Sequence, residues 1–169
     1  HTLVLGDSGT GKELVARAIH ALSSRGARPL LSRNAATIPE GLVDAEVFGN
    51  VRGYPNPGML DRAGLIGDAN ASSLFLDEIG ELSHEVQAHL LRVLDEGEYH
   101  RLGETTRKRS DFRLIAATNR QEAELKHDFA ARLMTRVQVP NLNQRREDVP
   151  LLAAHELDDR LGRLEVRHR

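Results

Sequence analysis

The sequence predicts an α/β fold in which a parallel β-sheet is flanked by helices. Short apolar runs typical of buried strands alternate along the chain with helical patterns, as they do in βαβ units. Several of these runs end in glycine or in polar residues, where a strand gives way to a loop. With 169 residues, 40% hydrophobic and 28% charged, the chain is long enough for one domain with its own core.

The first half of the chain is expected to contain three strands and one long helix. Residues 2–5 (TLVL) predict a buried strand that ends at Gly6. Apolar residues recur at helical spacing over 13–22, so a helix follows. A second strand is expected to begin at 29–31, and a third at 73–76.

The second half is expected to add two strands and two helices. Helical spacing over 86–94 predicts a helix that stops near Gly97. Residues 112–116 predict the fourth strand and 137–139 a short fifth, which completes a five-stranded sheet. A last helix is expected to open at Val149-Pro150 and to carry Leu151, Leu152 and Leu157, because proline is tolerated in a first helical turn.

Residues 49–67 interrupt this regular pattern. They hold several glycines and prolines and show no clear periodicity, so we expect a long loop insertion. Loops of this length are uncommon inside compact domains and often carry function.

Composition excludes several classes of protein. A net charge of -2 gives no reason to expect DNA or an anionic membrane as an obligate partner of this segment. The absence of Cys excludes disulfides and thiolate metal sites, and no apolar run approaches the ~20 residues of a membrane span. We therefore expect a soluble, cytoplasmic domain, and since the chain opens directly on a strand, a fragment of a longer protein.

The segment after the first strand matches the G-x-x-x-x-G-K pattern of a P-loop. Its glycines let backbone N–H groups face the phosphates of ATP, while Lys12 reaches the β- and γ-phosphates. A chance match in a glycine-rich turn is the alternative, but a strand precedes the motif and a helix follows, as a P-loop requires. Glu13 stands where the general pattern has a Ser or Thr for Mg²⁺. The candidate ATP-binding residues are Gly6, Asp7, Ser8, Gly9, Thr10, Gly11, Lys12 and Glu13.

Two carboxylates follow the third strand. In a parallel sheet this strand end lies beside the phosphate loop, where ligands bind. Asp77 is placed to hold Mg²⁺, and Glu78 to polarise the water that attacks the γ-phosphate. A solvated strand end, or acids favoured in the first turn of a helix, is the alternative interpretation.

Five blocks of sequence together resemble the AAA+ domains of sigma-54-dependent transcription activators, the bacterial enhancer-binding proteins. They are GDSGTGKELVAR (6–17), LFLDEIGEL (74–82), LLRVLDEG (90–97), IAATNR (115–120) and RREDVPLL (145–152). The likeness covers nearly the whole chain, and in that family the P-loop Lys is normally followed by Glu, as Lys12 is by Glu13. The resemblance therefore identifies the fold as an AAA+ P-loop NTPase.

The resemblance implies an ATP-hydrolysing ring, usually a hexamer, whose subunits share each ATP site. Asn34 stands where the family has an Asn that holds the catalytic Glu, with a turn-forming amide as the alternative. Thr118 and Asn119 match the sensor at the end of the fourth strand, with a plain strand cap as the alternative for Asn119. RNA polymerase with sigma-54 is the partner that the family implies.

The chain departs from the family at the arginines that reach into the neighbouring subunit. The family has two, six residues apart; aligned on Phe129, the first falls on Ala130 and the second on Arg136. Arg132 lies nearby as a substitute, so Arg132 and Arg136 are both candidates.

A second departure is in the loop that touches the sigma factor. Where the family has Gly-Ala-Phe-Thr-Gly-Ala, this chain has GYPNPG at 53–58, which is similar to a variant branch. Pro55 and Pro57 each fix φ near -65°, so the tip is expected to be stiff and extended, with Tyr54 as its one aromatic anchor. The family's helical lid, its signal-receiving domain and its DNA-binding domain are expected to be absent here, so any DNA contact would be made outside this segment.

Two other patterns carry less weight. His84-Glu85 and His89 look like a zinc-protease motif, but the two His differ in position by five, where a difference of four would place both on one helix face, so we interpret them as exposed. The run 107–109 (RKR) is either a phosphate-binding patch or a charged hairpin turn, and the turn is favoured.

Two functions remain open. The first is an ATPase that remodels sigma-54 RNA polymerase, which the intact Asp77-Glu78 pair favours. The second is a nucleotide-sensing module that controls assembly or DNA occupancy without remodelling, which the altered loop and the missing first arginine favour.

Overall fold

The computed structural model describes residues 1–154 and divides the chain into two compact units, His1–Val139 and Pro140–Arg169. The first unit carries the predicted site. It holds a five-stranded parallel sheet in the order β2-β3-β6-β1-β7, as the sequence predicted. The strands are β1 (Thr2–Leu5), β2 (Leu31–Asn34), β3 (Ser73–Asp77), β6 (Arg113–Thr118) and β7 (Thr135–Gln138).

Successive side chains of the central strands point to opposite faces of the sheet, as the strand pleat requires. On β3, Leu74 and Leu76 enter the larger core cluster and Phe75 the smaller one. On β1, Leu3 and Val4 divide in the same way. Both faces are therefore apolar, which explains why these strands read as continuous apolar runs.

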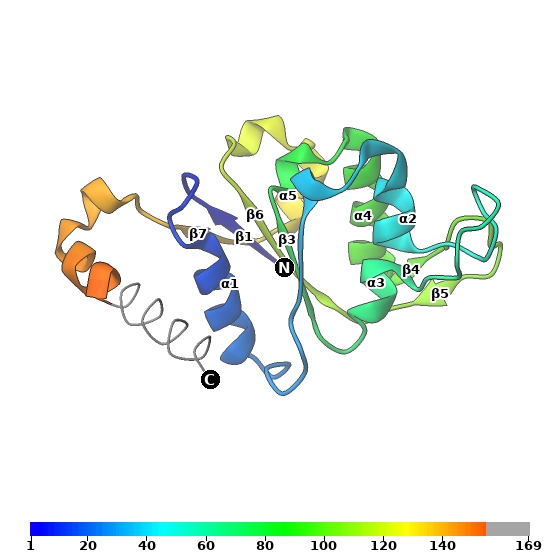
Figure 1. Cartoon of the computed structure of the whole chain (residues 1–169), viewed down its shortest axis with the longest axis horizontal. Helices are drawn as coiled ribbons and strands as arrows, with labels where there is room; N and C mark the ends of the chain where they lie inside the picture. Colours follow the sequence, from blue (N-terminus) through cyan, green and yellow to red (C-terminus); the bar gives the residue numbers. More distant parts are fainter. Residues whose placement is uncertain (155–169) are drawn as a thin grey trace, which may run out of the picture. The chain divides into compact units, whose positions relative to one another are not determined.

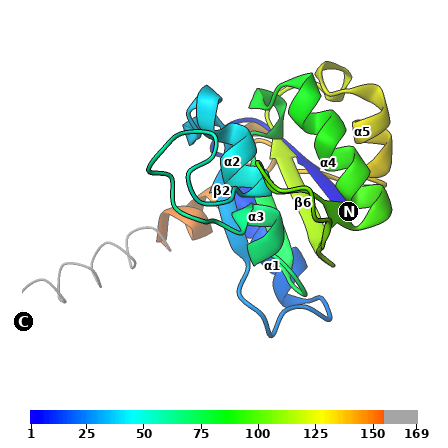
Figure 2. The ribbon, with the colours of Figure 1, turned by 90° about the vertical axis from the view of Figure 1, so that its right-hand side faces the viewer.

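Helices cover both faces (Figure 1). Helix α1 (Lys12–Ala21) packs on one face through Ala16. The other face is covered by α2 (Val43–Phe48), α3 (Gly64–Asp68), α4 (His84–Glu96) and α5 (His127–Arg132). In Figure 2, which looks onto this layer, α2 stands beside α3 and α4 beside α5. Short 3₁₀ turns connect these elements: η1 (Ala35–Thr37), η2 (Glu40–Leu42), η3 (Ile79–Glu81) and η4 (Glu122–Glu124).

A buried histidine fastens α1 to the sheet. The Nδ1 of His20 lies 3.0 Å from Oγ of Ser73 on β3, and its Nε2 lies 2.8 Å from the carbonyl oxygen of Arg28. This bond pattern fixes the distance between α1 and β3, and so helps to place the phosphate loop that precedes α1.

The second strand starts later than the sequence predicted. Pro29 has no N–H to donate to a neighbouring strand, and its carbonyl instead accepts a 2.6 Å bond from the Ser72 hydroxyl. Pairing begins at Leu31, opposite Leu74, and continues to Asn34, opposite Asp77.

The insertion expected at 49–67 is shorter and more ordered than predicted. Asn50 pairs with Arg62 and closes the base of the loop, and residues 64–68 form α3 with Ile66 fully buried. A helix of five residues is too short to show periodicity, so the sequence pattern could not reveal it.

The loop tip is folded back, so the expectation of an extended tip was wrong. The Gly53 N–H donates to the Met59 carbonyl (2.8 Å), and the Met59 N–H donates to the Asn56 carbonyl (3.1 Å). Tyr54 packs on Gly103, where an added Cβ would come within 2.7 Å of the Tyr54 ring. These backbone hydrogen bonds across the loop outweigh the tendency of proline to keep the residue before it extended.

Strands β4 (Glu98–Tyr99) and β5 (Lys108–Arg109) form a separate antiparallel hairpin. The hairpin predicted at 107–109 is confirmed, although Lys108 and Arg109 lie in its strand and not in its turn. Arg107 and Arg109 both pair with Glu98, at 3.2 and 2.8 Å. Both guanidinium groups are thus engaged by one carboxylate within the hairpin, which disfavours the phosphate-binding alternative.

The second unit, taken by itself, begins with the turns η5 (Leu142–Gln144) and η6 (Arg146–Asp148), followed by helical residues 149–154. The predicted helix opening at Val149 is confirmed, while Leu157 lies outside the described residues. Within residues 1–154, no helix has the length and apolar character needed to cross a bilayer.

Candidate functional site

Apart from the two candidate arginines, the predicted site residues lie at or just after the ends of four neighbouring strands, at the same edge of the sheet. Leu5, the last residue of β1, is paired with Thr118 of β6, and the Gly6 N–H donates to the Thr118 carbonyl (3.3 Å). On the other side, Asn34 is paired with Asp77. The parallel register therefore brings the phosphate loop, the acidic pair and the sensor residues to one edge, where α/β sheets bind ligands.

The phosphate loop ends in a left-handed residue that opens α1. Gly11 is the N-cap of α1 with φ 91°, a conformation that favours glycine. Asp7, Ser8 and Gly9 are exposed, and Thr10 is buried with its hydroxyl donating to the Asp7 carbonyl (2.8 Å). The loop thus has an open crest and a buried base, the arrangement that a phosphate cradle needs.

Lys12 lies under this crest and is only 6% exposed. Its ammonium donates to the carbonyls of Gly6 (2.9 Å) and Asp7 (3.2 Å) and lies 3.9 Å from Oε1 of Glu78. A buried ammonium held among carbonyls and a carboxylate is well placed to turn toward an incoming phosphate.

The carboxylate of Glu13 lies on the exposed surface of α1. It pairs with Arg17 one turn along α1 (2.8 Å), and both side chains are more than half exposed. The position where the general P-loop pattern has a Mg²⁺-binding Ser or Thr, predicted here as an ATP-binding Glu, therefore carries a helix-surface ion pair.

The acidic pair sits on a turn with an unusual backbone. Glu78 has φ 50° and ψ 48°, the left-handed region that a residue with a side chain adopts rarely. Its N–H donates to Oδ1 of Asp77 (3.0 Å), and its carboxylate Oε2 accepts from the Asn119 N–H (3.3 Å). Such conformations cost about 1–3 kcal/mol and cluster at functional sites.

The sensor candidates have clear local bonds. Thr118 is fully buried, and its hydroxyl accepts from the Arg120 N–H (3.0 Å). Asn119 contacts Glu78 through its backbone. Asn34 caps η1 by accepting the Ala36 N–H (2.9 Å), which corresponds to the turn-forming alternative, although its place beside Asp77 also keeps it at the site.

The two candidate arginines are held by different bonds. Arg136 donates to both oxygens of Glu122 and to the Leu133 carbonyl (3.1 Å), and this pairing lowers the pKa of Glu122 and raises that of Arg136. Arg132, at the end of α5, forms an ion pair with Asp95 of α4 at 2.7 Å. Arg136 is thus fixed within its own subunit more firmly than Arg132.

The residues fit the nucleotide and its metal on chemical grounds. A buried lysine under exposed backbone suits a polyphosphate, and an aspartate at a strand end suits Mg²⁺. Within residues 1–154, no group of three or more His, Cys, Asp or Glu side chains has the arrangement of a metal site. Mg²⁺ that is held by one carboxylate together with phosphates does not need such a group.

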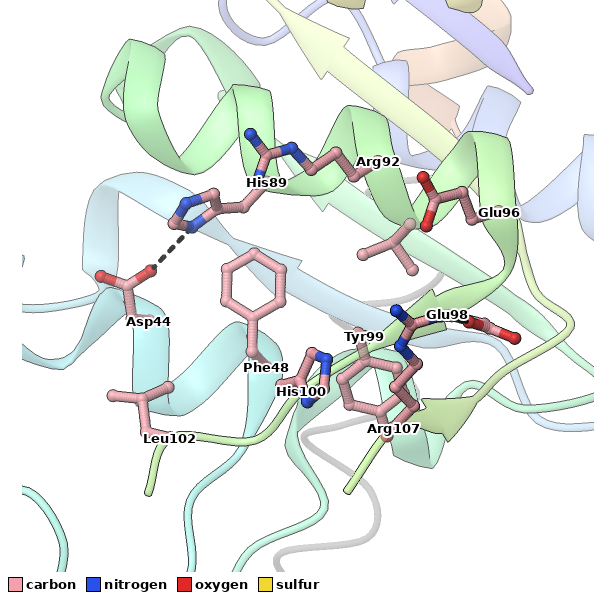
Figure 3. Close-up of a pocket in the computed structure, with 11 residues that line it drawn as sticks. Asp44, Phe48, His89, Arg92, Glu96, Glu98, Tyr99, His100, Leu102 and Arg107 are labelled. Atoms are coloured by element: carbon pink, nitrogen blue, oxygen red, sulfur yellow. Dashed lines mark hydrogen bonds and ion pairs between the residues drawn. The ribbon is translucent and has the colours of Figure 1, made fainter. Parts of the chain in front are cut away.

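A separate cavity of about 660 Å³ lies between α2, α4 and the β4–β5 hairpin (Figure 3). Phe48, Val93 and Tyr99 provide an apolar wall, and His89, 4.0 Å from Asp44, lies at the edge with its ring against Phe48. None of the residues predicted to bind ATP lines it. The sequence does not indicate this cavity, because the cavity depends on α2, which shows no periodic pattern.

Known proteins are similar to this chain in sequence. Residues 1–143 match the profile of the sigma-54 interaction domain. The chain belongs to this family. It is 46% identical to the transcriptional regulatory protein ZraR of Salmonella typhimurium, over 92% of this chain and 37% of ZraR. It is 44% identical to the formate hydrogenlyase transcriptional activator of the same species, over 95% of this chain and 25% of that protein.

A solved structure agrees. NtrX from Brucella abortus in complex with ATP superposes with a TM-score of 0.80 and 38% identity, over 91% of this chain and 36% of NtrX. The fold is therefore that of the AAA+ P-loop ATPases, as the sequence predicted. The chain spans about a quarter to two fifths of the length of these relatives.

Proposed function

We propose that this domain binds and hydrolyses ATP in a bacterial transcription regulator and couples turnover to remodelling of sigma-54 RNA polymerase. The observation that carries the proposal is the convergence of Lys12, Asp77 and Glu78 at one edge of the sheet. Family membership and the likeness to NtrX in complex with ATP support it.

In this proposal the backbone of residues 6–11 and the Lys12 ammonium hold the phosphates. Asp77 would hold Mg²⁺, which supplies charge neutralisation to the phosphates when bound. Glu78, kept in place by the Asn119 N–H, accepts a proton from the attacking water, while Asn34 and the Thr118-Asn119 segment orient the groups around it. Of the residues assigned from sequence, Glu13 has the weakest support, because its carboxylate pairs with Arg17.

A cation from the neighbouring subunit completes the site in this proposal, and the packing of α5 favours Arg132 over Arg136. Leu125, Phe129 and Leu133 are all buried at a spacing of four. Between these buried positions lie two cations six residues apart, Lys126 and Arg132. Six residues is the separation that the family pattern requires. Arg136 instead serves its own subunit by binding Glu122.

The experiment is a steady-state ATPase assay on the full-length protein with Mg²⁺, over a range of protein concentrations, together with mass measurement with and without nucleotide. We expect the protein to be cytoplasmic and to assemble into rings, expected to be hexamers. ATP turnover per subunit should therefore rise with protein concentration as the rings form. Absence of turnover at every concentration, with ATP still bound, would overturn the hydrolysis proposal.

A second candidate function is a nucleotide-sensing module that controls assembly or DNA occupancy without remodelling. The observation that favours it is the loop tip, where Tyr54 packs on Gly103 and where proline replaces the residues of the usual contact loop. Binding to isolated sigma-54 separates the two candidates.

A further inference from the structure

Two charged residues outside the predicted site join the strand ends that carry Glu78 and Asn119. Glu81 closes η3, three residues after Glu78, and Arg120 directly follows Asn119. The Arg120 Nη2 donates to Oε1 of Glu81 at 2.5 Å. Because β3 and β6 are neighbours in the sheet, this bond spans the gap between them at the catalytic edge.

Each residue of this ion pair is also hydrogen-bonded through its backbone N–H within its own turn. The Glu81 N–H donates to the Glu78 carbonyl (2.9 Å), and the Arg120 N–H donates to the hydroxyl of the fully buried Thr118 (3.0 Å). The ion pair therefore links two short, internally bonded turns.

The path of the Arg120 side chain also depends on its neighbour. It crosses Gly80, where an added Cβ would lie 2.9 Å from Cδ of Arg120 and 3.3 Å from Oγ1 of Thr118. Arg120 reaches Glu124 as well, at 3.8 Å. The guanidinium is thus directed across the turn that begins at Glu78.

We propose that Glu81 and Arg120 form a positioning pair that holds the carboxylate of Glu78 at the Asn119 N–H, in the orientation needed to activate water. Glu78 has a left-handed backbone that its own preference does not maintain, so neighbouring bonds must hold it. This inference rests on the proposed ATPase function. Glu81 and Arg120 act through Glu78 and do not touch the nucleotide in this proposal.

The expected effect on the catalytic rate distinguishes this positioning role from a contribution to stability alone. Both side chains are 39% exposed, and exposed ion pairs contribute little to stability. Misplacement of a catalytic group by about 1 Å, in contrast, can lower a rate by about 10²-fold. A positioning pair therefore affects kcat far more than folding.

The test compares Arg120→Ala, Glu81→Gln and the double variant Glu81→Gln/Arg120→Ala with the wild type in the full-length protein. We expect kcat for ATP to fall by about 10- to 100-fold in each single variant, with KM and ATP affinity within about twofold. The double variant should lose no more than the larger single loss, because the two residues act through one bond. Arg109→Ala, which breaks a comparable surface pair on the hairpin, is the matched control and should leave kcat unchanged.

The outcomes are distinguishable. Unchanged kcat in Arg120→Ala and Glu81→Gln, additive losses in the double variant, or a loss of ATP affinity would overturn the positioning role. If Arg120→Ala fails to fold, Glu81→Gln decides alone, since it keeps the shape of the side chain. A wild type that binds ATP without hydrolysing it would instead refute the proposed function and the pair with it.

Discussion

Lys12 and Glu78 are neighbours at the edge of the sheet, with Nζ of the lysine 3.9 Å from Oε1 of the glutamate. One comes from the start of α1 and the other from the turn after β3, so only the parallel register of the strands brings them together. Their separate roles can be tested by separate substitutions.

Lys12→Ala should abolish ATP binding, because the loop loses its charged contact to the β- and γ-phosphates. Glu78→Gln should bind ATP and lose turnover by about 10²- to 10⁴-fold, the range for a positioned base. Isothermal titration and a steady-state ATPase assay measure the two effects, and circular dichroism checks that both variants fold. Normal hydrolysis by Glu78→Gln would assign the base to another residue.

The sequence predicted this part of the molecule well because its elements are long or chemically distinctive. The β1 and β3 runs are apolar on both faces, and the glycines around Lys12 admit few other interpretations. The predicted ends of the strands were less accurate. Strands β3 and β6 extend to Asp77 and Thr118, beyond the predicted ends at 76 and 116, because polar side chains at a strand end do not stop backbone pairing.

Features that depend on long-range packing were not predictable. Helices α2, α3 and α5 have five or six residues each, fewer than periodicity requires. The Glu81–Arg120 pair joins turns far apart in the sequence, and no local pattern indicates that they meet. The prediction of an extended loop tip was wrong because the backbone bonds that close the loop outweigh the local preference of Pro55 and Pro57.

The trans cation can be identified by comparing Arg132→Ala with Arg136→Ala. If Arg132 reaches the neighbouring ATP, its removal should leave nucleotide binding nearly intact and lower turnover by about 10³- to 10⁵-fold in a favourable case. Arg136→Ala should mainly lower the melting temperature, because Glu122 loses its partner. Turnover by mixtures of Arg132→Ala with Glu78→Gln subunits provides the control, since defects in different half-sites complement within one ring. Full activity of Arg132→Ala with an inactive Arg136→Ala would return the role to Arg136.

The Glu122–Arg136 pair also predicts a dependence of stability on pH. The hydrogen bond from Arg136 lowers the pKa of Glu122 in the folded state below its ordinary value of 4.5. Stability from this pair is therefore fully present above that value and is lost as the pH falls through the lower, folded-state pKa. The melting temperatures of the wild type and Glu122→Gln should differ at pH 7 and converge toward pH 3. A difference that stays constant over this range would contradict the assignment.

The last prediction concerns the loop tip, where Tyr54 lies on Gly103 and both prolines flank Asn56. The standard sigma-54 contact needs a tip that can rise, whereas the Gly53–Met59 and Met59–Asn56 bonds close this one. The full-length protein, trapped with a transition-state analogue of ATP hydrolysis, would be tested for binding to isolated sigma-54 as wild type and as Tyr54→Ala. Leu22→Ala, an exposed apolar change at the end of α1, is the control. We expect Tyr54→Ala to bind sigma-54 to the same extent as the wild type. If both proteins bind, the remodelling function acts through another surface. If neither binds, the nucleotide-sensing function is favoured. Tight, analogue-dependent binding that disappears in Tyr54→Ala but survives in Leu22→Ala would show that this tip makes the conventional contact after all.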